Sequence, residues 1–278
     1  MTIITRFAPS PTGPLHLGHA YSAIISHDMA RREGGKFNVR IEDLDQSRSK
    51  KKWENRIFDD LDWLGLFWDE PVVRQSERID RYKNILTKFS KELGLFECVC
   101  SRRDIKNALS APHESETLLG PDGIIYPGTC REKTFSSQLK FKNALRMHVK
   151  LSENRLFSFC ELGPRKNEIL FSSEEFAKTV GDVVLWRKGY PAYHLACVVD
   201  DFEQKITHVV RGLDLFDATK IHTVLNSSLG FKKPFYYHHR LICDENGKRL
   251  AKRHDAKSIY KYRQEGFKPS DVRTLLGF

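Results

Sequence analysis

The chain has 278 residues, of which 40% are apolar, and its 46 Lys and Arg outnumber 36 Asp and Glu. This length predicts a main domain with a smaller inserted or appended one. No stretch approaches the roughly 20 apolar residues of a membrane helix, and the start lacks a signal-peptide pattern, so we expect a cytoplasmic protein with no membrane partner. The net charge of +10 is typical of proteins that bind a polyanion.

The N-terminal residues predict a βαβ unit. Residues 3–7 are rich in β-forming side chains, and residues 8–14 hold three prolines and a glycine, which exclude regular structure. A helical stretch follows at residues 17–32. Residues 36–42 then alternate as a strand that places three apolar side chains on one face: Phe37, Val39 and Ile41. This order predicts a parallel sheet with a right-handed crossover, and hence an α/β fold.

The rest of the chain alternates helical and strand patterns around one irregular stretch. Apolar spacing predicts amphipathic helices over residues 53–64 and 79–93, the second closed by Gly94. Residues 98–135 are loop-rich and predict an insert that needs a cross-link, such as a bound metal, to hold it together. Residues 231–278 hold 12 Lys and Arg against 5 Asp and Glu, with tyrosines between them. This basic segment suits RNA phosphates, and a solvated basic face is the alternative.

Two histidines stand three residues apart at the start of the first expected helix, at His16 and His19. The free N–H groups of a helix N-terminus form a site ready for phosphates, and the imidazoles add donors. Gly18 between them would let a nucleotide approach the backbone closely. The pattern therefore predicts a phosphate site, with two ordinary surface histidines as the alternative. A metal site is disfavoured because no further ligand lies nearby in the sequence.

Three of the six cysteines form a metal-binding pattern: Cys98, Cys100 and Cys130. Structural disulfides are not expected in a reducing cytosol, so this close set points to a metal, with unrelated reduced thiols as the alternative. Three thiolates favour zinc, which takes four tetrahedral ligands in a structural site. The spacing leaves the fourth ligand open among Tyr126, His113 and Cys160. On chemistry alone histidine would be preferred, since tyrosine is a rare zinc ligand.

Several segments, taken in order, resemble the signatures of the glutamyl-tRNA synthetases, which are class I enzymes. They are residues 6–13 with 16–19, 40–48, 199–201, 210–212 and 248–254. The last of these resembles the second class I signature, with Arg249 in place of its first lysine and Ala251 in place of its serine. The likeness spans about residues 3–260. It implies a Rossmann-like core that condenses an amino acid with ATP and then transfers it to RNA.

The resemblance also implies roles for individual residues. Those expected at ATP are His16, Gly18, His19 and Lys252, of which the histidines and the lysine would be catalytic. Arg6 and Glu42 would bind the carboxylate and the ammonium of glutamate. The further glutamate contacts would come from Phe7, Ala8, Pro9, Ser10, Tyr193 and Arg211. Magnesium would enter with ATP, held mainly by its phosphates.

One subfamily fits best. The Cys-x-Cys and Tyr-x3-Cys pattern is similar to that of the glutamyl-queuosine tRNA(Asp) synthetases, and this resemblance selects one structural zinc on Cys98, Cys100, Tyr126 and Cys130. Only 25 residues follow Arg253, fewer than the anticodon-reading region of a tRNA-charging enzyme needs. We therefore expect a monomer that activates L-glutamate without tRNA. It would then transfer glutamate to queuosine in the anticodon of tRNA(Asp).

The expected organisation has four parts. Residues 1–97 would form the first half of the Rossmann-like core, and residues 98–135 the zinc-binding insert. Residues 136–235 would form the rest of the core with an acceptor-type insert. Residues 236–278 would carry the second-signature loop and a small, mostly helical, basic segment. The alternatives are a core-only paralogue that charges a tRNA 3′ end, and a non-catalytic, zinc-stapled RNA-binding relic.

Overall fold

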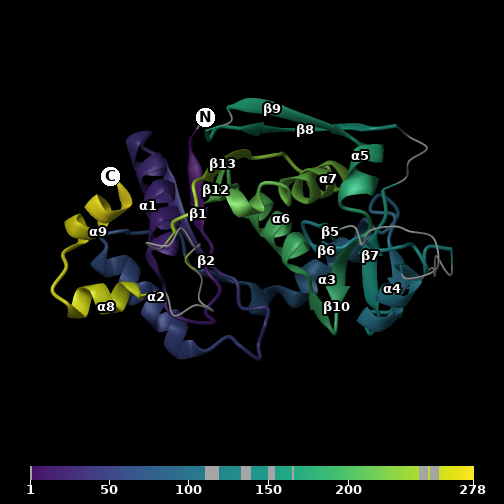
Figure 1. Cartoon of the computed structure of the whole chain (residues 1–278), viewed down its shortest axis with the longest axis horizontal. Coiled ribbons are helices and arrows are strands. Elements are labelled where there is room, and N and C mark those ends of the chain that lie inside the picture. The colour runs from purple at the N-terminus through teal and green to yellow at the C-terminus, as the bar shows by residue number, and fades with distance from the viewer. Residues whose placement is uncertain are drawn as a thin grey trace.

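The computed structural model describes residues 2–109, 119–132, 139–149, 154–164, 166–243, 250 and 257–278. Among these residues, no helix has the length and apolar character of a membrane span. The elements fall into a parallel core, an insert with its own sheet, and a helical C-terminal segment (Figure 1).

The first half of the core is a parallel sheet. Its elements in chain order are β1 (Ile4–Phe7), α1 (Leu17–Arg32), β2 (Lys36–Ile41), α2 (Lys51–Trp63) and β3 (Val73–Arg74). Because β1 pairs in parallel with β2, and β2 with β3, the predicted βαβ unit is confirmed. The predicted apolar face of β2 is buried, and Asn38 and Arg40 on its other face are buried as well. The strands of a parallel sheet are commonly covered on both faces.

The second half of the core continues this sheet. Its strands are β8 (Leu156–Glu161), β9 (Asn167–Ser172), β12 (His208–Gly212) and β13 (Phe235–His239). β12 lies against β1, because the Thr207 N–H donates to the Ile4 carbonyl at 2.9 Å. β12 also pairs in parallel with β13. The resulting order β3-β2-β1-β12-β13 is that of a doubly wound sheet, and ligands bind at the carboxyl ends of the strands where the order reverses, here between β1 and β12.

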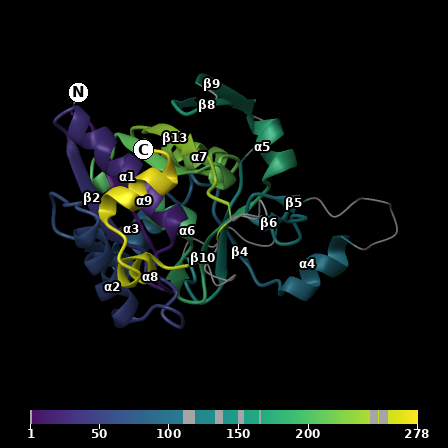
Figure 2. The ribbon, with the colours of Figure 1, turned by 60° about the vertical axis from the view of Figure 1, so that its left-hand side comes forward.

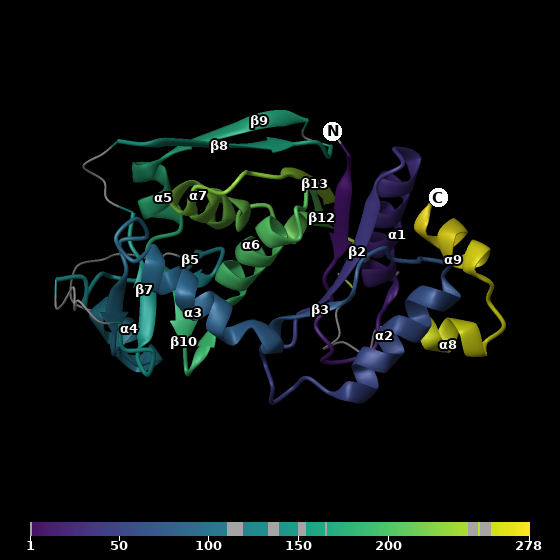
Figure 3. The ribbon, with the colours of Figure 1, turned by 180° about the vertical axis from the view of Figure 1, so that it is seen from behind.

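Helices cover the core, and the insert stands beside it. The further core helices are η1 (Gln75–Arg78), α3 (Ile79–Lys88), α6 (Tyr193–Glu203), η3 (Leu213–Leu215) and α7 (Thr219–Leu229). α3 ends earlier than predicted, since the chain leaves the helix at Phe89 and turns before Gly94, whose φ is +55°. α3 packs against α6 of the core (Figure 3).

The insert has an antiparallel sheet of its own, in the order β11-β10-β7-β4. Its elements are β4 (Phe96–Cys98), α4 (Arg102–Leu109), β5 (Leu119–Gly120), β6 (Gly123–Ile124), β7 (Ala144–Met147), α5 (Ser173–Thr179), β10 (Val183–Arg187) and β11 (Tyr190–Pro191). Figure 2 shows α4 on the side of the molecule away from α1 and α2.

The C-terminal segment is helical, as predicted, with α8 (Ile259–Gln264) and α9 (Pro269–Leu276). Arg273 of α9 pairs with Asp28 of α1 at 2.7 Å. The Arg56 guanidinium of α2 lies 3.8 Å above the ring of Tyr260 in α8. These contacts fix the segment to the first half of the core, opposite the insert (Figure 1).

Candidate active site

A cleft of about 1700 Å³ opens where β1, β2 and β12 end. Every predicted glutamate or ATP contact in the described part of the chain lines it: Arg6, Phe7, Ala8, Pro9, Ser10, His16, Gly18, His19, Glu42, Tyr193 and Arg211. Lys252 lies outside the described residues, as do Arg249 and Ala251. Pockets for small ligands are commonly about 300–1,000 Å³, so this cleft has room for a nucleotide, an amino acid and part of a larger partner.

The histidine pair stands at the N-terminus of α1. His16 caps the helix, with its Nδ1 accepting the Gly18 N–H at 3.1 Å. The His16 N–H donates in turn to Nδ1 of His19 at 3.2 Å. A neutral imidazole carries one N–H, so in neutral form both rings hold their proton on Nε2. Each ring can therefore offer an Nε2–H to a phosphate oxygen, beside the N–H groups of the helix end.

Gly18 leaves space for the capping imidazole of His16. A Cβ at this position would lie 3.0 Å from Cε1 of His16. Such a contact would press on the capping imidazole and disturb its hydrogen bond. The sequence pattern predicted that a nucleotide approaches the backbone closely at this position. The structure adds a second reason for glycine, which is the space taken by the His16 ring.

Described residues in and next to the second signature reach the same region. The Leu250 N–H donates to the Ile242 carbonyl at 3.0 Å, and both residues line the cleft. The Ile259 N–H donates to the Leu15 carbonyl at 2.8 Å, next to a β-bridge between His16 and Ser258. Ser258 and Ile259 are thus held beside the histidine pair, and Leu250 lines the same cleft.

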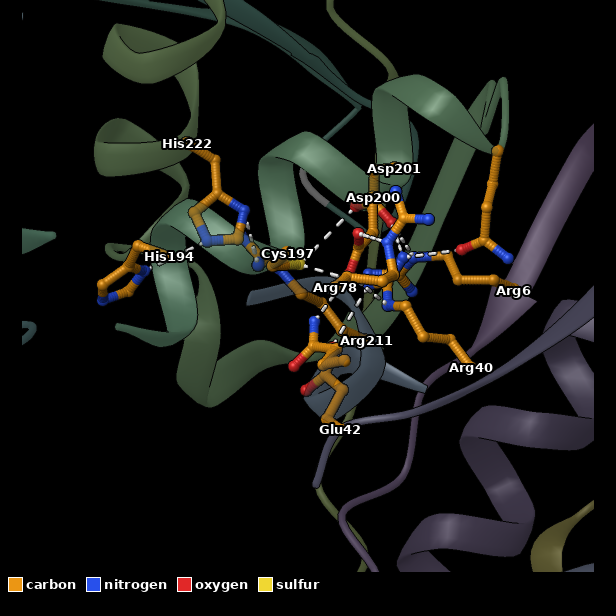
Figure 4. Close-up of polar contacts among 12 residues, drawn as sticks. Arg6, Arg40, Glu42, Arg78, His194, Cys197, Asp200, Asp201, Arg211 and His222 are labelled. Atoms are coloured by element: carbon orange, nitrogen blue, oxygen red, sulfur yellow. Dashed lines mark hydrogen bonds and ion pairs between the residues drawn. The ribbon is translucent and has the colours of Figure 1, made fainter. Parts of the chain in front are cut away.

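Two guanidinium groups share one buried carboxylate next to the cleft (Figure 4). Arg6 Nε donates to Asp201 Oδ1 at 3.0 Å, and Arg40 Nη1 donates to the same oxygen at 2.7 Å. Burial alone would raise the pKa of Asp201, but Arg6 and Arg40 hold that pKa below its usual range. The ionised Asp201 therefore fixes Arg6 at the end of β1, where it faces the cleft.

Glu42 follows β2 directly and is the acidic group of the predicted glutamate site. Arg40 Nη2 donates to its Oε1 at 3.2 Å. Burial raises the pKa of Glu42 above its usual value, although Arg40 and Arg6 act in the opposite direction. Nearby arginines neutralise the charge of Glu42 only in part, so this carboxylate at the end of a strand suits a substrate ammonium.

Arg211, at the end of β12, makes its contacts with neutral groups. Its Nε donates to Nε2 of His238 at 3.1 Å, Nη2 donates to Thr219 Oγ1 at 2.7 Å, and Nη1 lies 3.4 Å from Nδ1 of His222. Burial, and then the charge of Arg211, lower the pKa of His222 well below its usual value.

These contacts leave Arg211 able to bind an anion. Arginine has five N–H donors, and the contacts in the described part of the chain leave one on each terminal nitrogen. Two such donors form the fork that binds a carboxylate.

Several residues of this site had no predicted role. Arg40 and Asp201 lie inside the matched segments 40–48 and 199–201, so the resemblance could have indicated them. His222 and His238 belong to no matched segment. They meet Arg211 only because α7 and β13 fold beside β12.

The predicted metal ligands also come together. The three thiols of Cys98, Cys100 and Cys130 lie within 4.8 Å of one another. The Tyr126 hydroxyl lies 3.5 Å from Cys98 Sγ and 3.4 Å from Cys100 Sγ. Zinc bonds of about 2.3 Å to sulfur and about 2.0 Å to oxygen, at tetrahedral angles, separate these ligands by about 3.5 Å. The donor set therefore fits zinc.

Of the other candidates for the fourth ligand, the one within the described residues does not join this group. Cys160 lies on β8, in a different sheet. His113 lies outside the described residues. The Tyr126 hydroxyl also accepts the Cys130 N–H at 2.9 Å, which orients its oxygen toward the thiols.

Comparison with known proteins agrees with the site. The family model of the catalytic domain of class I tRNA synthetases (E and Q) matches residues 2–277. A glutamyl-Q tRNA(Asp) synthetase of Rhodobacter capsulatus is 50% identical over 99% of this chain and 100% of its own length. One of Prochlorococcus marinus is 39% identical over 96% of this chain and 78% of its own.

A solved structure gives the same result. The glutamate tRNA ligase of Elizabethkingia meningosepticum, in complex with its amino acid, superposes with a TM-score of 0.78 at 27% identity. The match covers 97% of this chain and 59% of that longer protein. The predicted family and fold are therefore confirmed: the chain belongs to the class I tRNA synthetases of the E and Q type, which are ligases, and within them to the glutamyl-Q tRNA(Asp) synthetases.

Proposed function

We propose that this protein joins L-glutamate to ATP as glutamyl-adenylate and transfers the glutamyl group to queuosine in the anticodon of tRNA(Asp). One observation supports the activation step: Arg211 and Glu42 line the same cleft as His16 and His19. A guanidinium fork suits the side-chain carboxylate and Glu42 suits the ammonium, while the helix end suits phosphates. The name of the 50% identical relative supports the acceptor.

The chemistry needs positioning rather than a nucleophilic side chain. An oxygen of the glutamate α-carboxylate attacks the α-phosphorus of ATP, and the bond to pyrophosphate breaks. His16 and His19 would donate Nε2–H groups to the phosphates as charge develops, and Lys252 would neutralise the leaving pyrophosphate. Magnesium bound to ATP would supply further charge neutralisation. A hydroxyl of the queuosine diol would then attack the acyl carbon and release AMP.

Basic residues on the insert side of the cleft support an RNA partner. Arg102 and Lys106 of α4, Arg146 of β7, Arg187 of β10 and the adjacent Lys188 all line it. Lysine and arginine contacts to phosphates position a nucleic acid without reading its sequence. An anticodon loop held there would lie across the cleft from the histidine pair.

We further propose one structural zinc on the three cysteines and Tyr126. Four protein ligands leave no open position for water, so the ion would stabilise the insert and take no part in the reaction. We retain the expectations of a monomer acting in the cytoplasm, where its substrates are found, and of the four-part domain division.

The acceptor is tested with labelled glutamate, ATP and two forms of tRNA(Asp), one carrying queuosine and one carrying guanosine at the same position. We expect label on the first form only, in the anticodon fragment after nuclease digestion. Label on both forms, at the 3′ end, would instead identify a paralogue that charges tRNA. Activation without transfer to either RNA would refute the proposed acceptor.

A further inference from the structure

The orientation of Arg211 depends on His238. β12 and β13 pair in parallel with Arg211 opposite His238, so the two side chains share one face of the sheet. The Arg211 Nε–H donates to Nε2 of His238 at 3.1 Å. A nitrogen that accepts this bond carries no proton, so a neutral His238 must hold its proton on Nδ1.

A buried carboxylate selects this tautomer. Oε2 of Glu161, at the end of β8, accepts the Nδ1–H of His238 at 2.5 Å. The other oxygen, Oε1, accepts two backbone N–H groups, that of His238 at 3.0 Å and that of Gly163 at 2.8 Å. The side chains of Glu161 and His238 are each 1% exposed. The Glu161 carboxylate is therefore shielded from solvent, and its hydrogen bonds come from protein groups.

The backbone at Gly163 packs closely against this carboxylate. A Cβ at position 163 would lie 2.5 Å from Glu161 Oε1 and 2.8 Å from the His238 carbonyl, so only glycine allows this approach.

The charges follow from the same contacts. Burial alone would raise the pKa of Glu161, but its hydrogen bonds from His238 and Gly163 lower it. Burial lowers the pKa of His238, against the opposing effects of Glu161 and of Asp214 nearby. The arrangement is therefore an ionised Glu161, a neutral His238 and a charged Arg211.

We infer that Glu161 and His238 are positioning residues for Arg211, which hold its guanidinium fork toward the cleft and leave its charge for a substrate carboxylate. A direct ion pair between Glu161 and Arg211 would neutralise the charge of Arg211. The His238 imidazole lies between them instead. It orients Nε of Arg211 through a neutral acceptor and keeps the Glu161 carboxylate away from the guanidinium. The inference rests on the proposed function only for the identity of the bound carboxylate, glutamate.

Glu161→Gln gives a sharp test, because its amide can adopt one orientation only. Two backbone N–H groups require the amide oxygen at the Oε1 position, so the NH₂ group must face Nδ1 of His238. That nitrogen must then accept, and the imidazole proton moves to Nε2, where it faces the Arg211 Nε–H. Replacing a carboxylate by its amide in such a relay produces the wrong histidine tautomer. The Thr219 hydroxyl, 3.1 Å from Nε2, could accept this proton, but the Arg211 Nε–H would lose its acceptor.

The experiment combines histidine ¹⁵N NMR with pyrophosphate exchange on the full chain. In the wild type, His238 should be neutral at pH 7 with its proton on Nδ1, and in Glu161→Gln the proton should be on Nε2. The KM for glutamate should rise about 10- to 100-fold, the effect of weakening hydrogen bonds to a charged group. The kcat should change by less than about threefold, because Arg211 holds the substrate equally before and during the reaction.

Glu54→Gln is the matched control. Glu54 is a buried carboxylate of α2 that pairs with Arg74 and Lys51, and it does not line the cleft. This variant should leave both the His238 tautomer and the KM unchanged, even if it lowers the melting temperature as much as Glu161→Gln does.

Several results would overturn the inference. A wild-type His238 with its proton on Nε2, or charged at pH 7, would do so even if Glu161→Gln fails to fold. An unchanged tautomer or an unchanged KM in a folded Glu161→Gln would do so as well. If the wild type shows no glutamate-dependent exchange, the proposed function fails. The tautomer of His238 in the wild type and in Glu161→Gln would then still show whether Glu161 sets the hydrogen bond between His238 and Arg211.

Discussion

Replacing Arg211 by lysine separates the charge of this side chain from the shape of its fork. Lysine keeps the positive charge but carries its donors on one nitrogen. It cannot reach His238 and Thr219, as Arg211 does, and also present two parallel donors to a substrate. Losing one charge-assisted hydrogen bond to glutamate costs about 1.5–3 kcal/mol, or about 10- to 150-fold in kcat/KM.

The assay is pyrophosphate exchange at varied glutamate, with glutamine as the competing substrate. Arg211→Lys should raise the KM for glutamate and narrow the preference for glutamate over glutamine. Arg273→Lys is the control, because Arg273 also makes a two-point contact with a carboxylate, Asp28, on the far side of α1. The reasoning is refuted if both variants lose activity equally, or if Arg211→Lys changes kcat alone.

Three further predictions concern acidity, stability and metal. Because burial raises the pKa of Glu42, the KM for glutamate should rise as the pH is lowered from neutrality; a KM that does not change with pH in exchange assays would contradict its contact with the ammonium. Burial raises the pKa of Asp60 to about 7, so its contribution to stability is complete below about pH 4 and is lost as the pH rises to 7. Asp60→Asn should therefore increase the free energy of unfolding by up to about 4 kcal/mol at pH 8 and by less at pH 5, as measured with urea; an equal gain at both pH values would count against it. Cys130→Ser should lose zinc by elemental analysis and weaken transfer to RNA, while activation of glutamate persists; wild-type protein purified without chelator and free of zinc would remove the proposed site.

Local patterns predicted the parts of the site that are close in sequence. The loop before α1, the His16 and His19 spacing, and the Cys98 and Cys100 pair each fix a short piece of backbone. Hydrophobic periodicity then located β2 and the amphipathic helices α2 and α3, because neighbouring residues decide those elements. Lys252 stays a prediction, since it lies outside the described residues.

Contacts between distant segments could not be predicted in this way. Arg40 and Asp201 are 161 positions apart, and Glu161 and His238 are 77 apart. The alternation of β2 could not indicate that Arg40 on its polar face is buried too, because the carboxylate that makes burial of this charge tolerable comes from a second layer. Such pairs follow from the sheet order and register, which no single segment contains.

We expect the cleft to activate glutamate by itself, without RNA. Pyrophosphate exchange into ATP, measured with glutamate, magnesium and no RNA, tests it most directly. We predict exchange that saturates with glutamate, is negligible with glutamine, and does not change when tRNA is added. Exchange that appears only with tRNA, or that is equal for glutamate and glutamine, would contradict the account.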